Sequence, residues 1–292
     1  EEWLGAGQPV GAWSTGGSMN TARSSIGGAG TQISTLAFGG NTPTATAITE
    51  SYNGTAWTEV NDLNTARTQV AGAGADNTAS LAFSGYTGTA DTAVTESWNG
   101  SSWTNVASMN TARRSVGGAG ANNTAVLAIG GEAPIRAFVE SWNGSSWTEV
   151  GDLNTARNQL SSSGTTTSAL AFGGEAAPGV TAVTESYNGT SWTEVNDLNV
   201  AKRSAGGTGN SNSAALSFGG INPTPSRILT EEWNGVSWVE VADLSTGRYT
   251  NAGSGTTTAA LTFAGINPTP AITAATEEWN NPSNVLKVIT TS

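Results

Sequence analysis

A unit of about 45 residues recurs along this chain and limits its possible folds more than any other feature of the sequence. One copy reads ESWNGSSWTEVGDLNTAR, from Glu140 to Arg157. The leading glutamate returns at intervals of 46, 44, 45, 46 and 46 residues after Glu50. A second signature, LAFGG and its variants, alternates with the first in constant order. A period of this length marks one structural unit that is repeated, so we expect an array or a closed ring of similar units.

Within one unit the pattern predicts four short β-strands. A run of small residues such as SVGGAG (Ser115 to Gly120) precedes an alternating run such as ALAFGG (Ala169 to Gly174). The third run, TAVTESYNG (Thr181 to Gly189), passes through Asn-Gly into SWTEV, and Asn-Gly between alternating runs is a strong hairpin signal. Abundant Gly, Thr and Val oppose helix. Six such units predict an all-β fold, a six-bladed β-propeller of four-stranded antiparallel blades.

The two ends of the chain are expected to close the ring. The segment from Trp13 to Arg23 aligns without gaps to the segment from Trp57 to Arg67, which is a fourth strand and its following turn. The last unit, from Arg248 to Trp279, supplies only three strands. We therefore predict that the N-terminal residues 1–23 complete the last blade. The tail VLKVIT, from Val285 to Thr290, is the alternative occupant of that place.

The repeat covers the whole chain, so we expect residues 1–292 to form one domain, with a C-terminal tail at 280–292. The chain opens with EEW, in the middle of the motif, and we expect it to be part of a longer protein.

Composition excludes several classes of function. The formal net charge is −11 and the isoelectric point is near 4.4, which argues against nucleic acid and anionic membranes as partners because both attract basic surfaces. Cysteine and histidine are absent, so thiolate nucleophiles are excluded and the commonest metal ligand and general base is missing. No apolar run approaches the ~20 residues of a membrane span. We expect no cofactor, no metal ion and no membrane insertion.

The recurring glutamate shares one face of its strand with two large apolar side chains, so it is expected to be buried and therefore paired. The recurring cation closes the LNTAR turn. We predict six structural ion pairs, each between a third strand and the turn that starts a neighbouring inner strand, with Glu50 and Arg67 as one pair. The alternative is a ring of arginines at the channel mouth that grips an anion such as a carboxylate or a sulfate. The residues concerned are Glu50, Glu96, Glu140, Glu185, Glu231, Glu277, Arg23, Arg67, Arg113, Arg157, Lys202 and Arg248.

The units differ most after the Gly-Gly doublet, in loops that should emerge at the same end of the propeller as the LNTAR turns. Exposed, variable loops on a rigid scaffold are the usual place for binding. We single out Tyr86, Arg136, Arg227 and Tyr249 as candidate ligand contacts, although exposed loops also vary without any function. The recurring aromatic pairs, such as Tyr52 with Trp57, are interpreted as blade core rather than as sugar-stacking platforms.

One unit carries a Gly-Gly doublet at Gly173-Gly174, an aromatic pair at Tyr187 and Trp192, and the turn Leu198-Asn199. These features resemble the kelch-repeat family over essentially the whole chain. The resemblance implies a propeller that binds partners at the end bearing the turns and variable loops. The motifs TESYNGTSWTEV and DLNTAR are also similar to those of repeat-rich virion proteins of marine tailed phages.

Catalysis is not expected. Glu231-Glu232 and Glu277-Glu278 are adjacent in a strand and point to opposite faces, which does not make an acid/base pair. SYNGTAW (Ser51 to Trp57) is similar to the sialidase Ser-x-Asp-x-Gly-x-x-Trp box, but Asn replaces Asp and one residue is missing. A glycosidase-type propeller enzyme is therefore the weakest alternative.

The leading hypothesis is a binding or structural module on a virion surface or in the extracellular space. Its partners would be other virion proteins, or a glycan or receptor on the host surface. A secreted or periplasmic lectin is the main alternative.

Overall fold

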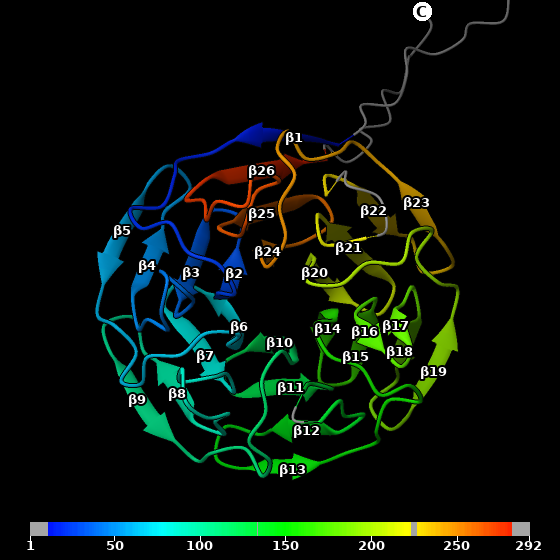
Figure 1. Ribbon diagram of the computed structural model, residues 1–292. Coiled ribbons are helices and arrows are strands. Elements are labelled where there is room, and N and C mark those ends of the chain that lie inside the picture. Colours follow the sequence, from blue (N-terminus) through cyan, green and yellow to red (C-terminus); the bar gives the residue numbers. More distant parts are fainter. Residues whose placement is uncertain (1–10, 133, 223–226, 282–292) are drawn as a thin grey trace, which may run out of the picture.

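The computed structural model describes residues 11–132, 134–222 and 227–281. These residues form six four-stranded antiparallel sheets, which are arranged as blades around a central channel (Figure 1). In each blade the first strand of the unit lies nearest the channel and the fourth strand lies outermost. The predicted all-β, six-bladed propeller is confirmed.

The strands of the first three blades follow chain order. Blade 1 consists of β2 (Gly27–Thr31), β3 (Ser34–Phe38), β4 (Thr49–Tyr52) and β5 (Trp57–Val60). Blade 2 consists of β6 (Ala71–Asp76), β7 (Ala79–Phe83), β8 (Thr95–Trp98) and β9 (Trp103–Val106). Blade 3 consists of β10 (Gly117–Asn122), β11 (Ala125–Ile129), β12 (Val139–Trp142) and β13 (Trp147–Glu149).

The other three blades follow the same pattern with two additions, a short ribbon in a loop of blade 4 and the N-terminal strand in blade 6. Blade 4 consists of β14 (Ser161–Thr165), β15 (Ser168–Phe172), β18 (Thr184–Tyr187) and β19 (Trp192–Val195). Its β15–β18 loop contains the two-stranded ribbon of β16 (Glu175–Ala176) and β17 (Gly179–Val180). Blade 5 consists of β20 (Gly206–Ser211), β21 (Ala214–Phe218), β22 (Thr230–Trp233) and β23 (Trp238–Glu240). Blade 6 consists of β24 (Ala252–Gly255), β25 (Ala259–Phe263), β26 (Thr276–Asn280) and β1 (Ala12–Thr15).

The N-terminal strand closes the ring, as predicted. Trp13 of β1 pairs with Trp279 of β26, and the sheet order is β1-β26-β25-β24. Trp13 also packs at 5.0 Å from Phe218 of blade 5 and donates its indole N–H to Thr230 Oγ1 at 3.1 Å. The closing strand therefore ties blade 6 to its neighbour. The rival segment, Val285 to Thr290, lies outside the described residues.

The inner strands are built from small residues because they approach one another closely. A Cβ atom on Gly118 would lie 2.6 Å from the carbonyl oxygen of Gly72, on the inner strand of the adjacent blade. A Cβ atom on Gly72 would lie 2.3 Å from the Phe38 ring, in the blade on its other side. No side chain fits at either position, so glycine is required where the strands converge on the channel.

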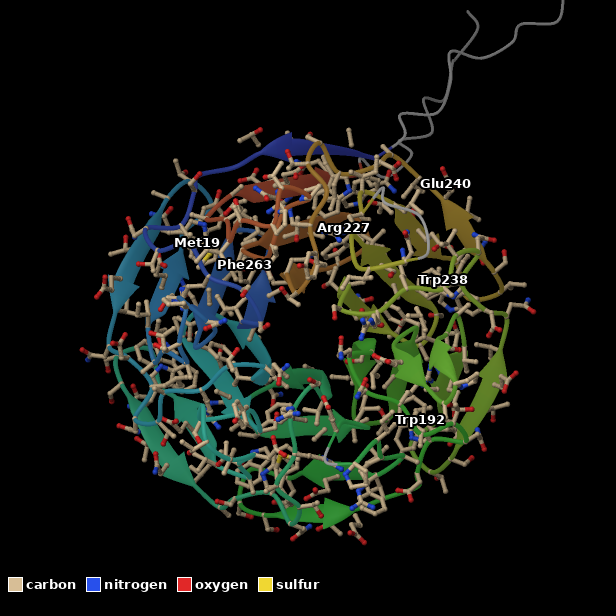
Figure 2. The ribbon with its side chains drawn as sticks, viewed as in Figure 1. Met19, Trp192, Arg227, Trp238, Glu240 and Phe263 are labelled. Carbon is tan, nitrogen blue, oxygen red and sulfur yellow. The ribbon has the colours of Figure 1, made fainter. Side chains whose placement is uncertain are left out.

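The core lies between neighbouring blades. Phe38 of blade 1 packs at 5.1 Å from Trp103 of blade 2, and Phe172 of blade 4 packs at 4.9 Å from Trp238 of blade 5. Figure 2 shows Trp238 in the outer part of the ring. The aromatic pairs such as Tyr52 and Trp57 are buried, so they form core and are not exposed platforms for sugars.

Candidate functional site

Two ends of the propeller must be distinguished. The turn face carries the LNTAR-type turns, which join the outer strand of one blade to the inner strand of the next, and the loops between the second and third strands. The hairpin face carries the Asn-Gly hairpins and the connections between the first and second strands. All the candidate residues named from the sequence belong to the turn face or to the layer directly beneath it.

Beneath the turn face, each recurring glutamate contacts one recurring cation. The oxygen-to-nitrogen distances range from 2.6 to 3.3 Å, and every one of these side chains is at most 4% exposed. The pairs are Arg23–Glu50, Arg67–Glu96, Arg113–Glu140, Arg157–Glu185, Lys202–Glu231 and Arg248–Glu277.

The partner named for Glu50 from the sequence was wrong. Arg67 contacts Glu96 at 3.1 Å, and Glu50 contacts Arg23 at 3.0 Å. The reason is the path of the turn, which begins after the outer strand of one blade and runs over the strand ends of the next. The Arg67 guanidinium therefore lies above β7 and β8 of the blade whose inner strand it starts, and it donates to the carbonyl oxygen of Ala82 there at 3.4 Å.

The glutamate holds the whole turn and not only the cation. Glu96 Oε2 accepts the backbone N–H of Asn64 at 2.6 Å, and Oε1 accepts that of Thr65 at 3.3 Å. Arg67 also donates to the carbonyl oxygen of Ser84 at 3.1 Å. Burial lowers the pKa of the Arg67 guanidinium to about 10, and the Glu96 carboxylate opposes that shift. Each such cluster acts as a latch that joins the end of one blade to the third strand of the next.

These buried cations do not form an anion-binding ring. Arg23, Arg67 and Arg157 are 0% exposed, and each already donates to a carboxylate. An external anion has no access to their guanidinium groups, so the alternative raised by the sequence is wrong for these residues.

The latch of blade 5 differs from the other five, because lysine replaces arginine there. Lys202 Nζ lies 3.3 Å from both Ser217 O and Glu231 Oε1, whereas Arg157 reaches its carbonyl and carboxylate partners with two separate nitrogens. Burial lowers the pKa of the Lys202 amine, which Glu231 opposes. A compact ammonium cannot match the forked geometry of a guanidinium.

We expect Lys202→Arg to raise the free energy of unfolding by about 1 kcal/mol, the value of one added hydrogen bond. The measurement is urea denaturation followed by tryptophan fluorescence. Arg157→Lys is the matched control in blade 4 and should lose a similar amount. Equal stability of both variants and the wild type would contradict the latch geometry.

A second ring, which was not predicted from the sequence, surrounds the channel mouth on the turn face. Its members have left-handed backbone conformations with φ between 50° and 55°. Each donates its backbone N–H to the carbonyl oxygen of its equivalent in the adjacent blade, at 2.8 to 3.4 Å, and Ser25 closes the circle by donating to Thr250. The six residues are Ser25, Gln69, Ser115, Gln159, Ser204 and Thr250. None is the Gly or Asn that signals this conformation, although each stands two positions after the recurring cation.

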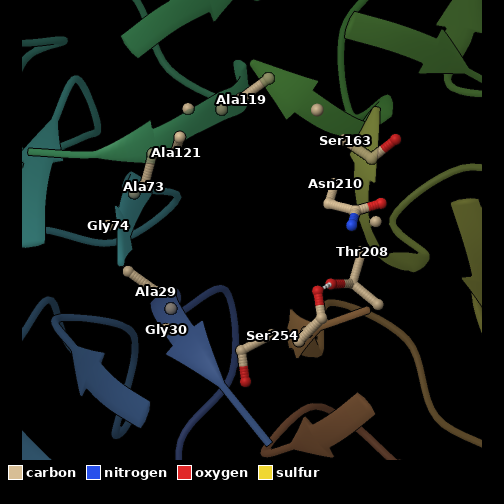
Figure 3. A pocket seen from close by; sticks show the side chains of 18 of the residues that line it. Ala29, Gly30, Ala73, Gly74, Ala119, Ala121, Ser163, Thr208, Asn210 and Ser254 are labelled. Carbon is tan, nitrogen blue, oxygen red and sulfur yellow. Dashed lines mark hydrogen bonds between the residues drawn. The ribbon is translucent and has the colours of Figure 1, made fainter. Parts of the chain in front are cut away.

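The channel has a pocket at each end. The ring of left-handed residues and the residues that follow them, such as Ile26 and Leu160, line a cavity of about 120 Å³ at the turn face. A cavity of about 220 Å³ lies toward the hairpin face (Figure 3). In this second pocket alanines such as Ala73 line one side, and hydroxyl side chains such as Ser163 and Ser254 line the other.

The four candidate contact residues lie on the turn face, where two of them meet. Arg227 stacks over the Tyr249 ring, with its guanidinium carbon 4.5 Å from the ring centroid. Arg136 stacks over Phe138 at 5.1 Å, and Tyr86 lies under a different arginine, Arg114, at 5.0 Å. The structure does not bring all four residues into one contact.

Sequence reasoning overlooked two further arginines on this face. Arg114 contacts Asp91 at 3.3 Å and Glu132 at 3.2 Å, and so links the loops of blades 2 and 3. Arg203 forms an ion pair with Glu175 and links blades 4 and 5 in the same way. Each directly follows a recurring cation. The residue type at this position differs from unit to unit, and that variation was the sequence signal that could have identified both arginines.

The described residues contain no cluster of three or more carboxylate, cysteine or histidine side chains placed to hold a metal ion. Within the same ranges no helix is long and apolar enough to cross a membrane.

Comparison with known proteins gives a structural likeness without a sequence family. Neither the protein-family models nor the curated proteins contain a match to this chain. Among solved structures, the chain is similar to one described as "Structure of YjhT", with a TM-score of 0.73 and 13% sequence identity over 89% of this chain and 96% of that one. The shared feature is the propeller fold. At this identity the likeness says nothing about the ligand.

Proposed function

We propose that this chain is a non-catalytic binding module of the kelch-repeat type, carried on the surface of a tailed-phage virion. It attaches the particle to a glycan or receptor on the host surface, or to other virion proteins. The observation that supports this proposal is the contrast between the two layers of the turn face. The latches beneath it repeat in every blade, whereas the loops on it carry charged and aromatic side chains that differ from blade to blade.

A rigid scaffold under variable loops suits recognition, because little ordering is needed when a partner binds. The buried ion pairs and the closed ring of backbone hydrogen bonds hold the loop ends in fixed positions. The same geometry would serve a secreted or periplasmic lectin. Such a lectin would use the same binding face and would differ only in where the protein is located.

The environment of the paired carboxylates also favours binding over catalysis. Glu277 is buried against Arg248, while its neighbour Glu278 accepts the hydroxyl of Tyr52 at 2.5 Å on the opposite face of the strand. Burial and the adjacent Glu278 raise the pKa of Tyr52 to about 12. The two carboxylates therefore have separate structural partners and do not converge on a common substrate position.

The absence of cysteine permits a direct test of which face binds. Thr89→Cys places a thiol on an exposed turn-face loop, and Ser101→Cys places one on an exposed hairpin. Each variant is coupled to a bulky maleimide and applied to a glycan array and to bacterial envelope preparations. We expect wild-type binding that is abolished by the group at Thr89→Cys and unaffected by the group at Ser101→Cys. Failure of the wild type to bind any glycan or envelope would refute the attachment role.

A further inference from the structure

Two arginines on the turn face differ from all the others in the chain. Each of the other arginines has a carboxylate oxygen within 3.3 Å, whether it is buried in a latch or half-buried on the surface, as Arg114 and Arg203 are. Among the described residues, Arg136 and Arg227 have no carboxylate partner. This is unexpected in a protein with 22 acidic residues and only 11 basic ones.

Arg136 and Arg227 occupy the same position of the repeat, four residues before the latch glutamate. In the other four blades this position is threonine, at Thr46, Thr92, Thr181 and Thr273. Each threonine hydroxyl accepts the backbone N–H two residues further along the chain, at 3.0 to 3.3 Å. The repeat itself therefore favours threonine here for a local structural reason.

Arginine cannot replace that contact. The guanidinium has donors but no acceptor, so blades 3 and 5 lose the side-chain acceptor that threonine supplies. In blade 3 the backbone is otherwise unchanged, since Arg136 donates its N–H to Gly131 O at 2.8 Å just as Thr92 donates to Gly85 O at 2.9 Å. In blade 5 the backbone differs as well, because Arg227 has a left-handed conformation with a φ of 47°. The fold alone gives no reason for arginine at these two positions.

Both guanidinium groups are held in place by an aromatic ring. Arg136 lies over Phe138 and Arg227 over Tyr249, at 5.1 and 4.5 Å from the ring centroids. Stacking fixes the plane of the guanidinium while its N–H groups can still donate at the edge. Burial lowers the pKa of the Arg113 guanidinium, the Glu140 carboxylate opposes that shift, and the nearby Arg136 adds to it through an unfavourable proximity of like charges. Figure 2 shows Arg227 on the loop between β21 and β22.

We infer that Arg136 and Arg227 bind the acidic groups of an acidic saccharide, each arginine pairing with a carboxylate or a sulfate of the ligand. This inference rests on the proposed function and names the ligand class of the turn face. A planar guanidinium matches both groups through two parallel hydrogen bonds. The two arginines lie on blades 3 and 5, with blade 4 between them, so a saccharide that carries several acidic groups satisfies both.

The test uses the residue that the repeat itself prefers. Arg136→Thr restores the threonine of the other four blades, and at position 227, where φ is 47°, Arg227→Asn supplies a residue that tolerates this left-handed backbone. The double variant should leave the melting temperature unchanged. The probes are dextran, carboxymethyl-dextran and dextran sulfate on biosensor surfaces, together with neutral and acidic members of a glycan array. Because the protein carries a net charge of −11, non-specific attraction to polyanions is not expected.

We expect the wild type to bind acidic saccharides and not neutral dextran, with about tenfold weaker binding for each arginine removed. Thr58→Glu/Thr104→Glu is the charge-matched control, because it makes the net charge more negative by the same two units at exposed positions of β5 and β9. This control should bind as the wild type does. Carboxymethyl-dextran and dextran sulfate distinguish the two acidic groups.

Four results would overturn the inference. The double variant could bind as tightly as the wild type, or the charge-matched control could lose as much affinity as that variant. The wild type could also bind neutral glycans alone, which would leave the proposed attachment role standing. The fourth result is that the wild type binds no glycan of either kind and no bacterial envelope, which would refute both the inference and the proposed attachment to the host surface.

Discussion

Glu96→Ala is expected to lower the free energy of unfolding by about 3–5 kcal/mol, because it leaves the buried Arg67 guanidinium without a counter-charge. The substitution also removes the acceptor for the backbone N–H groups of Asn64 and Thr65, so the turn between blades 1 and 2 loses its anchor. Chemical denaturation followed by tryptophan fluorescence measures the loss, since Trp98 and Trp103 flank the site.

A double-mutant cycle identifies the partner. Arg67→Ala combined with Glu96→Ala should show strong coupling, whereas Arg67→Ala combined with Glu50→Ala should be additive, because these two side chains belong to different latches. Glu59→Ala, at an exposed position of β5, is the control and should change stability by less than about 0.5 kcal/mol. Coupling of Arg67 with Glu50 instead of Glu96 would contradict the observed pairing.

Trp13→Ala is expected to destabilise the closed ring by about 3–5 kcal/mol, the range for removal of a large aromatic side chain from a core. Trp13 is 8% exposed and contacts both Phe218 and Trp279, so it joins the closing strand to two blades. Removing its indole also leaves the Thr230 hydroxyl without that donor. Differential scanning calorimetry measures the loss.

Loss of this strand should also change the solution behaviour of the protein. When β1 detaches, β26 becomes an exposed sheet edge that can pair with another chain. We therefore expect the Trp13→Ala variant to self-associate on mild warming, as seen by light scattering. Ser14→Ala, at the adjacent exposed position, should remain monodisperse and as stable as the wild type. A stable, monodisperse Trp13→Ala variant would show that β1 is not required for closure.

Much of the fold could be predicted because each unit repeats the same local signals. The Asn-Gly hairpins of the first five blades, the alternating second strand and the small residues of the first strand agree from blade to blade, and such agreement makes the assignment of strands secure. The closing strand could also be predicted, because the segment from Trp13 to Arg23 aligns without gaps to the segment from Trp57 to Arg67. Burial of the recurring glutamate followed from its place between apolar neighbours on one strand face.

Other features could not be predicted from the sequence, and the ring of left-handed residues around the channel mouth is one of them. Ser25 and Gln69 adopt positive φ without being Gly or Asn, because each exchanges backbone hydrogen bonds with the adjacent blades. That contact exists only when six blades close around a channel. Local propensity is overridden there by the geometry of the ring.

The sequence by itself determined the number of units, the four strands in each, the strand that closes the ring and the residue types that form the latches. Only the tertiary structure decided which glutamate meets which cation, because a periodic sequence looks the same when it is shifted by one unit. Such a sequence allows either Glu50 or Glu96 as the partner of Arg67. The turn runs over the next blade and therefore brings Arg67 to Glu96. Loop variability in the sequence was enough to name Arg136 and Arg227 as candidate contacts. Only the tertiary structure shows that every other arginine has a carboxylate partner and that these two stack on aromatic rings instead.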